Sequence, residues 1–198
     1  MFEVGVLQLH HPDGQVFAFE PGSLSMAFAI TGAPFDESRF ETLRNPEDLG
    51  RWAGAILDVP RINASTSDLT QAKRLRSAIW GGVDAVIDGL HPAAADRHVL
   101  NEAAGEAPLR PHLEPDGSST WLRPVTPAAV LSSVASDAID VISGPRAARL
   151  KRCQGLNCAI PFLDTSRPGT RRWCSMERCG NRAKARTHYQ RQRQEVSR

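Results

Sequence analysis

Cysteine is missing from the first 152 residues of this 198-residue chain, and all four cysteines follow that point. No apolar run approaches the ~20 residues that a membrane-spanning helix needs, so we expect no membrane partner. The N-terminus carries Glu3 and lacks a basic stretch, which argues against a signal peptide. Internal repeats and low-complexity segments are also missing. We therefore expect a cytoplasmic protein made of one medium domain and a small appended module.

Sequence motifs for catalysis are lacking as well. The chain has no P-loop, no glycine-rich dinucleotide fingerprint and no nucleophile elbow, and no histidine lies in an H-E-x-x-H motif. A histidine such as His98 on a helix is more often a surface or boundary residue than a catalyst. A triad assembled in space from distant positions stays open as an alternative, but we expect no enzyme and no catalytic residues.

The four cysteines form two C-x4-C pairs separated by fifteen residues: Cys153 with Cys158, and Cys174 with Cys179. Two close pairs of thiols joined by a loop are how a short chain builds a tetrahedral four-thiolate zinc site. Two disulfides would instead need an oxidising compartment, and chance burial would scatter the cysteines along the chain. The pattern predicts one structural Zn²⁺ with no open coordination position, and hence no hydrolytic chemistry.

Charge is divided unevenly between the two parts of the chain. Residues 144–198 hold 14 Lys and Arg against three acids, whereas the preceding 143 residues hold 10 against 19. Four thiolates on one Zn²⁺ leave a net charge of about −2, which two or three neighbouring cations can offset. The remaining cations indicate a surface that binds nucleic acid, although charge alone does not separate DNA from RNA.

A basic helix is predicted from about Ser175 to Gln194, directly after the second cysteine pair begins. Its arginines recur at spacings of four, four and seven from Arg178, so they share one face, and few acids are placed to compensate them. Arg171 and Arg172 lie in the loop between the pairs, beside Trp173, which we expect to pack on the zinc loop. The candidate nucleic-acid contacts are Arg171, Arg172, Arg178, Arg182, Lys184, Arg186, Arg191 and Arg193.

The residues around the cysteines resemble a known family. The run from Asp164 to Arg186, preceded by CQGLNC, is similar to the CGNR zinc finger, which takes its name from the tetrad that begins at Cys179. The likeness covers about the last fifty residues. Members of that family typically carry an N-terminal ABATE domain and are thought to be bacterial transcription regulators, so the resemblance implies a DNA-binding regulator whose N-terminal half binds an effector.

A short segment near the N-terminus is similar to the opening of ABATE domains, which typically reads LDFxNT. The chain keeps Phe28 and Thr31, and Met26 replaces the leucine. Ala27 and Ile30 stand where the family usually has an acid and an asparagine. If those polar residues contact a ligand in relatives, the resemblance implies that this chain has lost or changed the contact.

Apolar periodicity and turn residues predict the remaining elements. Strands are expected at 4–9 and 15–20 and again at 109–114 and 120–125, each pair around a turn, while residues 24–31 fit either a strand or a helix start. Helices are expected at about 46–59, 67–90, 91–104 and 127–143.

Three details of the predicted helices can be checked against the structure. The pair Gly81-Gly82 predicts a kink or break. Lys73, Arg74 and Arg76 are interpreted as a solvated face. On the last of these helices, Leu131, Val134, Ala138, Val141 and Ile142 are expected to be buried, and Ser132, Ser133, Ser136, Asp137 and Asp140 to face away.

Together these patterns predict an α+β protein. A mainly helical domain with a small antiparallel sheet occupies residues 1–143, and a zinc-finger module ending in a basic helix occupies 144–198. The preferred function is DNA-binding transcription regulation, in which the N-terminal domain binds an unknown small-molecule effector or mediates oligomerisation. A homodimer is a further expected partner, since regulators usually read two half-sites. An RNA-associated zinc protein and a thiol redox switch are the alternatives.

Overall fold

The computed structural model describes residues 4–32 and 40–196, apart from the side chains of Arg191 and of residues 194–196. The described elements follow the predicted α+β class, with helices and three two-stranded antiparallel sheets. In order they are β1 (Leu7–His10), β2 (Val16–Phe19), α1 (Leu24–Ala29), α3 (Pro46–Leu57), α4 (Thr66–Ile87), α5 (Ala94–Ala104), β3 (Pro111–Leu113), β4 (Ser119–Trp121), α6 (Pro127–Ser143), the 3₁₀ turn η1 (Ala147–Arg149), β5 (Leu150–Arg152), β6 (Pro161–Leu163), the π-helical turn η2 (Met176–Gly180) and α7 (Asn181–Val196).

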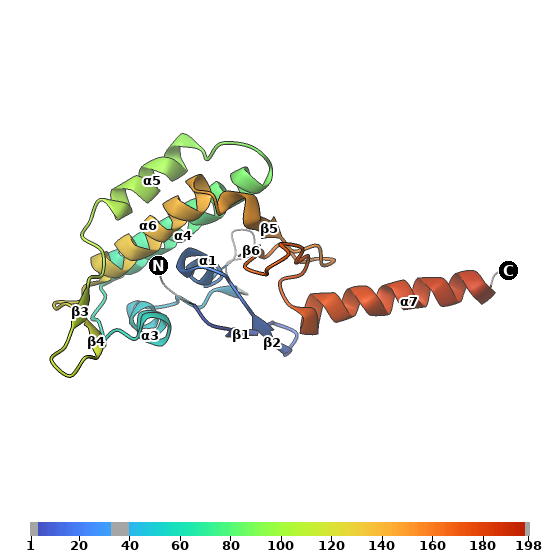
Figure 1. Cartoon of the computed structure of the whole chain (residues 1–198), viewed down its shortest axis with the longest axis horizontal. Helices are drawn as coiled ribbons and strands as arrows, with labels where there is room; N and C mark the ends of the chain where they lie inside the picture. Colours follow the sequence, from blue (N-terminus) through green and yellow to red (C-terminus); the bar gives the residue numbers. More distant parts are fainter. Residues whose placement is uncertain (1–3, 33–39, 197–198) are drawn as a thin grey trace.

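Helices α1, α3, α4, α5 and α6 enclose the larger hydrophobic core (Figure 1). Residues 24–29, which the sequence left ambiguous, are helical because the Ser23 side chain accepts from the Met26 N–H and caps the first turn. Asn45 and Ser65 form capping boxes on α3 and α4, and Thr126 caps α6. Local capping chemistry therefore fixes where these helices begin.

Of the predicted kink or break at Gly81-Gly82, the break is wrong, because helix α4 runs through both glycines without interruption. Both glycines sit where neighbouring helices approach closely. A Cβ on Gly82 would lie 2.8 Å from Cδ1 of Ile142 in α6, and one on Gly81 would lie 2.4 Å from a carboxylate oxygen of Asp96 in α5. Glycine at both positions therefore leaves room for the Ile142 and Asp96 side chains against α4.

The expected apolar stripe of α6 is buried, but three polar residues predicted to face away are buried too. Ser132 donates to the Glu106 carbonyl and Ser133 accepts from the Leu109 N–H. The Asp137 carboxylate accepts from both the N–H and the hydroxyl of Ser25 in α1. These hydrogen bonds compensate the burial and tie α6 to α1 and to the segment before β3.

Both predicted hairpins are present, with β1 paired to β2 and β3 paired to β4 in antiparallel register. The β1–β2 hairpin lies beside the C-terminal segment rather than inside the helical core (Figure 1). Phe17 and Phe19 of β2 form a second, smaller core with Phe162 of β6 and with three of the cysteines. The β1–β2 hairpin thus packs with the segment that carries the cysteines.

The acidic and basic parts of the chain are joined by ion pairs. Arg152 of β5 donates to Asp84 and Asp88 at the end of α4. Arg146, just after α6, pairs with Asp137 and Asp140. Part of the positive charge of the C-terminal segment is therefore neutralised within the molecule.

Within the described ranges 4–32 and 40–196, no helix is both long enough and apolar enough to cross a membrane.

Candidate metal centre and the basic helix

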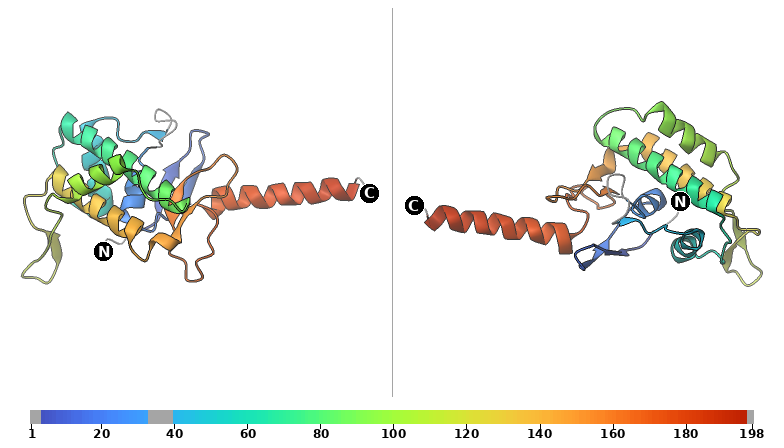
Figure 2. Two further views of the ribbon diagram at one scale, coloured as in Figure 1. Left: turned by 90° about the horizontal axis from the view of Figure 1, so that it is seen from above. Right: turned by 180° about the vertical axis from the view of Figure 1, so that it is seen from behind.

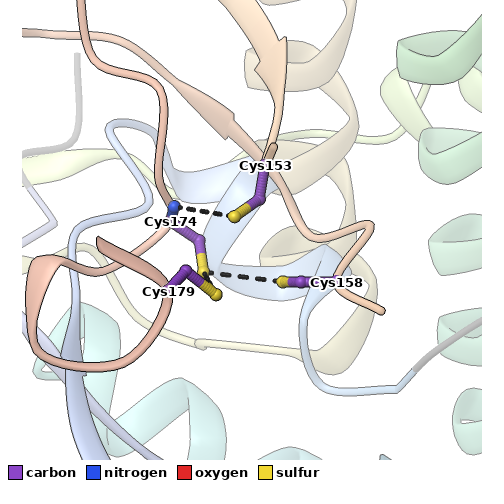
Figure 3. A group of neighbouring side chains, drawn as sticks. All are labelled: Cys153, Cys158, Cys174 and Cys179. Atoms are coloured by element: carbon purple, nitrogen blue, oxygen red, sulfur yellow. Dashed lines mark hydrogen bonds between the residues drawn. The ribbon is translucent and has the colours of Figure 1, made fainter. Parts of the chain in front are cut away.

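The structure brings the four cysteines together although they are spread over 27 positions of the chain (Figure 3). Their sulfur atoms all lie within 4.8 Å of one another, and no disulfide joins them. The Sγ atom of Cys174 lies 3.7 Å from that of Cys158 and 3.6 Å from that of Cys179. A tetrahedron with Zn–S bonds of ~2.3 Å has edges of about 3.8 Å, so the spacing fits a single zinc ion.

Each cysteine comes from a defined local structure. Cys153 directly follows β5, and Cys158 follows a tight turn in which Asn157 adopts a left-handed conformation with φ of 57°. Cys174 precedes η2, and Cys179 lies within it. Gly155 is required in the first turn, because a Cβ there would lie 2.7 Å from the sulfur of Cys179.

Hydrogen bonds from backbone N–H groups and the close spacing of the four thiols favour the binding of a cation. The N–H groups of Cys174 and Gly155 point at Sγ of Cys153, at 3.2 and 3.4 Å. Hydrogen bonds from Cys158 and the other thiols lower the pKa of Cys153, whereas the hydrogen bond with Cys153 raises the pKa of Cys174. Four thiols so close together lose all their protons only when a cation balances the charge, and the site therefore binds one structural zinc ion.

Asp164 holds the loop between the two cysteine pairs. Its carboxylate is fully buried and accepts from Lys151 Nζ at 2.6 Å, from the N–H and hydroxyl of Ser166, and from the Arg171 N–H. Burial alone would raise the pKa of Asp164, but hydrogen bonds from Lys151 and Ser166 outweigh it and lower the pKa well below its usual range. The ionised carboxylate thus fixes the loop that carries Cys174.

We expect Asp164→Asn to destabilise the protein by about 2–4 kcal/mol at pH 7, because the Lys151 ammonium loses its buried partner. Asp116→Asn is the matched control, since Asp116 makes the same two hydrogen bonds to a serine two residues on, but in the exposed β3–β4 turn. Urea unfolding of both variants checks the difference. Equal, small effects would contradict the role given to Lys151.

Two of the predicted nucleic-acid contacts lie inside the protein. Arg178 is 5% exposed, and its guanidinium binds Asp13 and Gln15 in the β1–β2 turn and lies over the Phe17 ring. Arg171 is partly buried over the Phe162 ring, 4.3 Å from its centroid.

Arg171 also donates to three backbone carbonyls, those of Glu20, Trp173 and Cys174. Burial lowers its pKa from the ordinary arginine value, although Glu20 and Cys174 act in the opposite direction. In this structure Arg171 and Arg178 therefore hold the module and the N-terminal hairpin together, and neither presents its charge to a partner.

The other predicted contacts are placed differently. Arg172 is exposed next to Trp173, which packs against the cysteine cluster as expected. Helix α7 projects from one end of the molecule, away from both cores (Figures 1 and 2). It carries exposed Arg182, Lys184, Arg186 and Arg193, while the side chain of Arg191 is not among those described.

The β1–β2 turn contains contacts that the sequence did not reveal. Asp13 binds both Arg178 and Arg182, and the Glu177 carboxylate accepts from the Ala18 N–H. Gln15, in the same turn, also accepts from Arg178. We refer to Asp13, Gln15, Glu177 and Arg178 as the hairpin clasp. The clasp joins positions more than 150 residues apart, and a lone acid in a turn gives no local signal of such a partner.

The site and the fold together define a two-part protein with a four-cysteine zinc module, and comparison with known families agrees. Residues 22–145 match the ABATE family, described as "Putative stress-induced transcription regulator". Residues 149–192 match the CGNR zinc finger. Because the first match covers more than half of the chain, the protein belongs to the ABATE family, and it carries the zinc finger predicted from its cysteines. No curated protein matches the chain.

The β1–β2 hairpin precedes the ABATE match yet packs with the zinc finger. Ile30, one of the two departures from the expected ABATE pattern, is partly buried against the smaller core, whereas Ala27 is buried within α1. Neither position carries a polar group in this chain.

Proposed function

We propose that the protein is a cytoplasmic, DNA-binding transcription regulator that contacts DNA through α7 and the adjoining zinc module. The observation that carries the proposal is the projection of a basic helix from a metal-anchored base (Figure 2). The sixteen residues of α7 span about 24 Å, and the major groove admits one helix. The description of the ABATE family supports regulation of transcription as the purpose of that contact.

The zinc site and the hairpin clasp give α7 a defined direction. Cys179 lies two residues before the start of α7, and Arg178 beside it is bound to the hairpin. A helix held in this way presents its cations at fixed positions, which is what phosphate contacts need in order to set the register on a duplex. Our proposal makes the N-terminal half the binding site for an effector, gives the chain no catalytic role, and takes a homodimer as the form that reads two half-sites.

The number of cations assigned to the interface sets an expected salt dependence. Arg171 and Arg178 are buried or partly buried in internal contacts, so the proposed interface keeps the other six predicted contacts: Arg172, Arg182, Lys184, Arg186, Arg191 and Arg193. Of these, Arg182 also pairs with Asp13. Neutralising six phosphates predicts that log affinity falls with log salt at a slope of about −5. A fluorescence-anisotropy titration over a range of salt measures the slope, and absence of binding to any duplex at low salt would overturn the proposal.

A matched pair of double variants tests whether α7 makes the contact. Lys184→Gln with Arg186→Gln removes two exposed cations of α7, and the slope should become shallower by about 2. Arg61→Gln with Arg110→Gln removes two exposed cations of the N-terminal half, and the slope should not change. Equal effects of the two pairs would assign binding to net charge alone.

Competition between duplex DNA and structured RNA separates the proposal from its nearest alternative. The same electrostatics serve an RNA-binding zinc module, so both ligands are expected to bind at low salt. We expect duplex DNA to displace a labelled hairpin RNA. The reverse order of affinity would replace the proposed function with an RNA-associated one.

A further inference from the structure

A cavity of about 330 Å³ lies where the helical core, the β1–β2 hairpin and the zinc module meet. Its walls come from all three parts: Leu9 and Phe17 from the hairpin, Trp80 from α4, and Ile160 from the zinc module. A volume of this size suits a small organic molecule, and apolar walls with a few polar groups are typical of such sites.

The charged groups around this cavity favour an anion. Glu41 lines it, but both of its carboxylate oxygens already bind Arg76, at 2.8 and 2.7 Å. Arg44 and Arg182 line it as well and are exposed, and because Arg182 also pairs with Asp13, Arg44 supplies the cation at its edge. An apolar body with one negative group matches this combination of wall and edge.

We propose that this cavity binds a small apolar anion, namely an aromatic or branched-chain carboxylate, which contacts the zinc module and the helical core at the same time. The cavity would be the effector site of the proposed regulator. Only this regulatory role of the bound molecule rests on the proposed function. Binding of the anion does not require DNA, because residues of this chain alone form the cavity.

A molecule bound in the cavity would contact the metal centre and the residues at the start of α7 directly. Two zinc ligands, Cys158 and Cys179, line the cavity, and Arg178 and Arg182 line it at the start of α7. A bound molecule therefore adds contacts to both cysteine turns. Any ligand that binds only the folded, zinc-loaded form stabilises that form by mass action, so zinc should leave more slowly when the cavity is filled.

Isothermal titration calorimetry with 1-naphthoate tests the proposal in the absence of DNA. We expect 1-naphthoate to bind at least tenfold more tightly than neutral 1-naphthamide, which has nearly the same shape. Ala159→Trp fills the cavity from a partly buried wall position, and should weaken binding at least tenfold. Ala107→Trp places the same side chain at an exposed position away from the cavity, and should leave binding unchanged.

A charge variant and a metal-release assay complete the test. Arg44→Gln should reduce the preference for naphthoate over naphthamide, whereas Arg61→Gln should not. In the wild-type protein, but not in Ala159→Trp, 1-naphthoate should slow transfer of zinc to 4-(2-pyridylazo)resorcinol several-fold. Equal binding of the two probes, or full binding by both Ala159→Trp and Arg44→Gln, would overturn the proposal. Either result leaves DNA binding to be decided by its own titration.

Discussion

Replacing Cys174 by serine is expected to remove the zinc and unfold the C-terminal module. The Cys174 side chain is fully buried, and its sulfur lies within 3.7 Å of two other ligands. A serine hydroxyl is not a zinc ligand of comparable strength, and structural zinc supplies apparent binding free energies of about 10–16 kcal/mol in zinc-finger peptides. Because this ligation energy is folding energy, a module with so small an apolar core should not persist without it.

The effect should extend to the N-terminal hairpin but not to the helical core. Phe17 and Phe19 pack against Phe162 and the cysteines, so loss of the module exposes them. Helix α4 loses the contacts made by β5, but α4 and α6 keep those with each other and with α1 and α5 in the larger core. Hydrogen exchange should therefore show lost protection in β1, β2, β5 and β6, and retained protection in α4 and α6.

Ser175→Ala is the matched control for this prediction. Ser175 adjoins Cys174 and is buried, and within the described part of the chain its hydroxyl has no hydrogen-bond partner. Removing an unpaired buried hydroxyl costs little or stabilises slightly. Zinc content by atomic emission and thermal melting measure both variants, and a fully metallated Cys174→Ser with an unchanged melting temperature would contradict the four-cysteine assignment.

The zinc site could be predicted because its determinants are local. Each cysteine pair lies within a six-residue stretch, so the spacing that forms a turn is visible in the sequence. The helix starts were also readable, because Asn45 and Thr126 cap the residues that directly follow them. Where capping or ligation acts over a few residues, the pattern and the structure agree.

The interior polar residues could not be predicted because their partners are distant in the chain. The sequence of α4 does not show that Arg76 meets Glu41, 35 residues earlier, and that of the basic helix does not show that Arg178 meets Asp13. Helical spacing placed Arg178 on one face with Arg182, but it could not show that the hairpin covers this end of that face. Helical periodicity predicts which face of a helix a side chain lies on, but it does not predict which distant residue that side chain contacts.

Loss of the Arg76 guanidinium is expected to be the costliest change in the helical core. Arg76 is 4% exposed, forms two hydrogen bonds with Glu41 and reaches the Thr31 hydroxyl at 3.3 Å. This arrangement corrects the interpretation of Arg76 as part of a solvated face, whereas Arg74 is exposed as expected. Removing Arg76 leaves the buried Glu41 carboxylate with only the partly exposed Lys73 ammonium, at 3.4 Å, so Arg76→Met should destabilise the protein by about 3–5 kcal/mol.

Arg74→Gln on the same helix is the control for this variant. Arg74 pairs with Glu102 at 3.3 Å, but both side chains are more than half exposed, so the change should stay within about 0.5 kcal/mol. Glu41→Gln combined with Arg76→Met should cost less than the sum of the single changes, because neither charge is then buried alone. Strict additivity in urea unfolding would show that the two side chains do not act as a pair.

The pH dependence of stability tests whether the ionised form of Glu41 stabilises the fold. Burial raises the pKa of Glu41, but the hydrogen bonds and charge of Arg76 outweigh burial and lower it below its usual range. A carboxyl with a lowered pKa in the folded state contributes stability that is present above its unfolded pKa of about 4.3 and is lost as the pH falls. The wild-type protein should therefore lose more stability than the double variant between pH 6 and pH 4. If both lose the same amount, the ionised Glu41 does not stabilise the fold, and the cost of Arg76→Met must arise from lost packing of its alkyl chain.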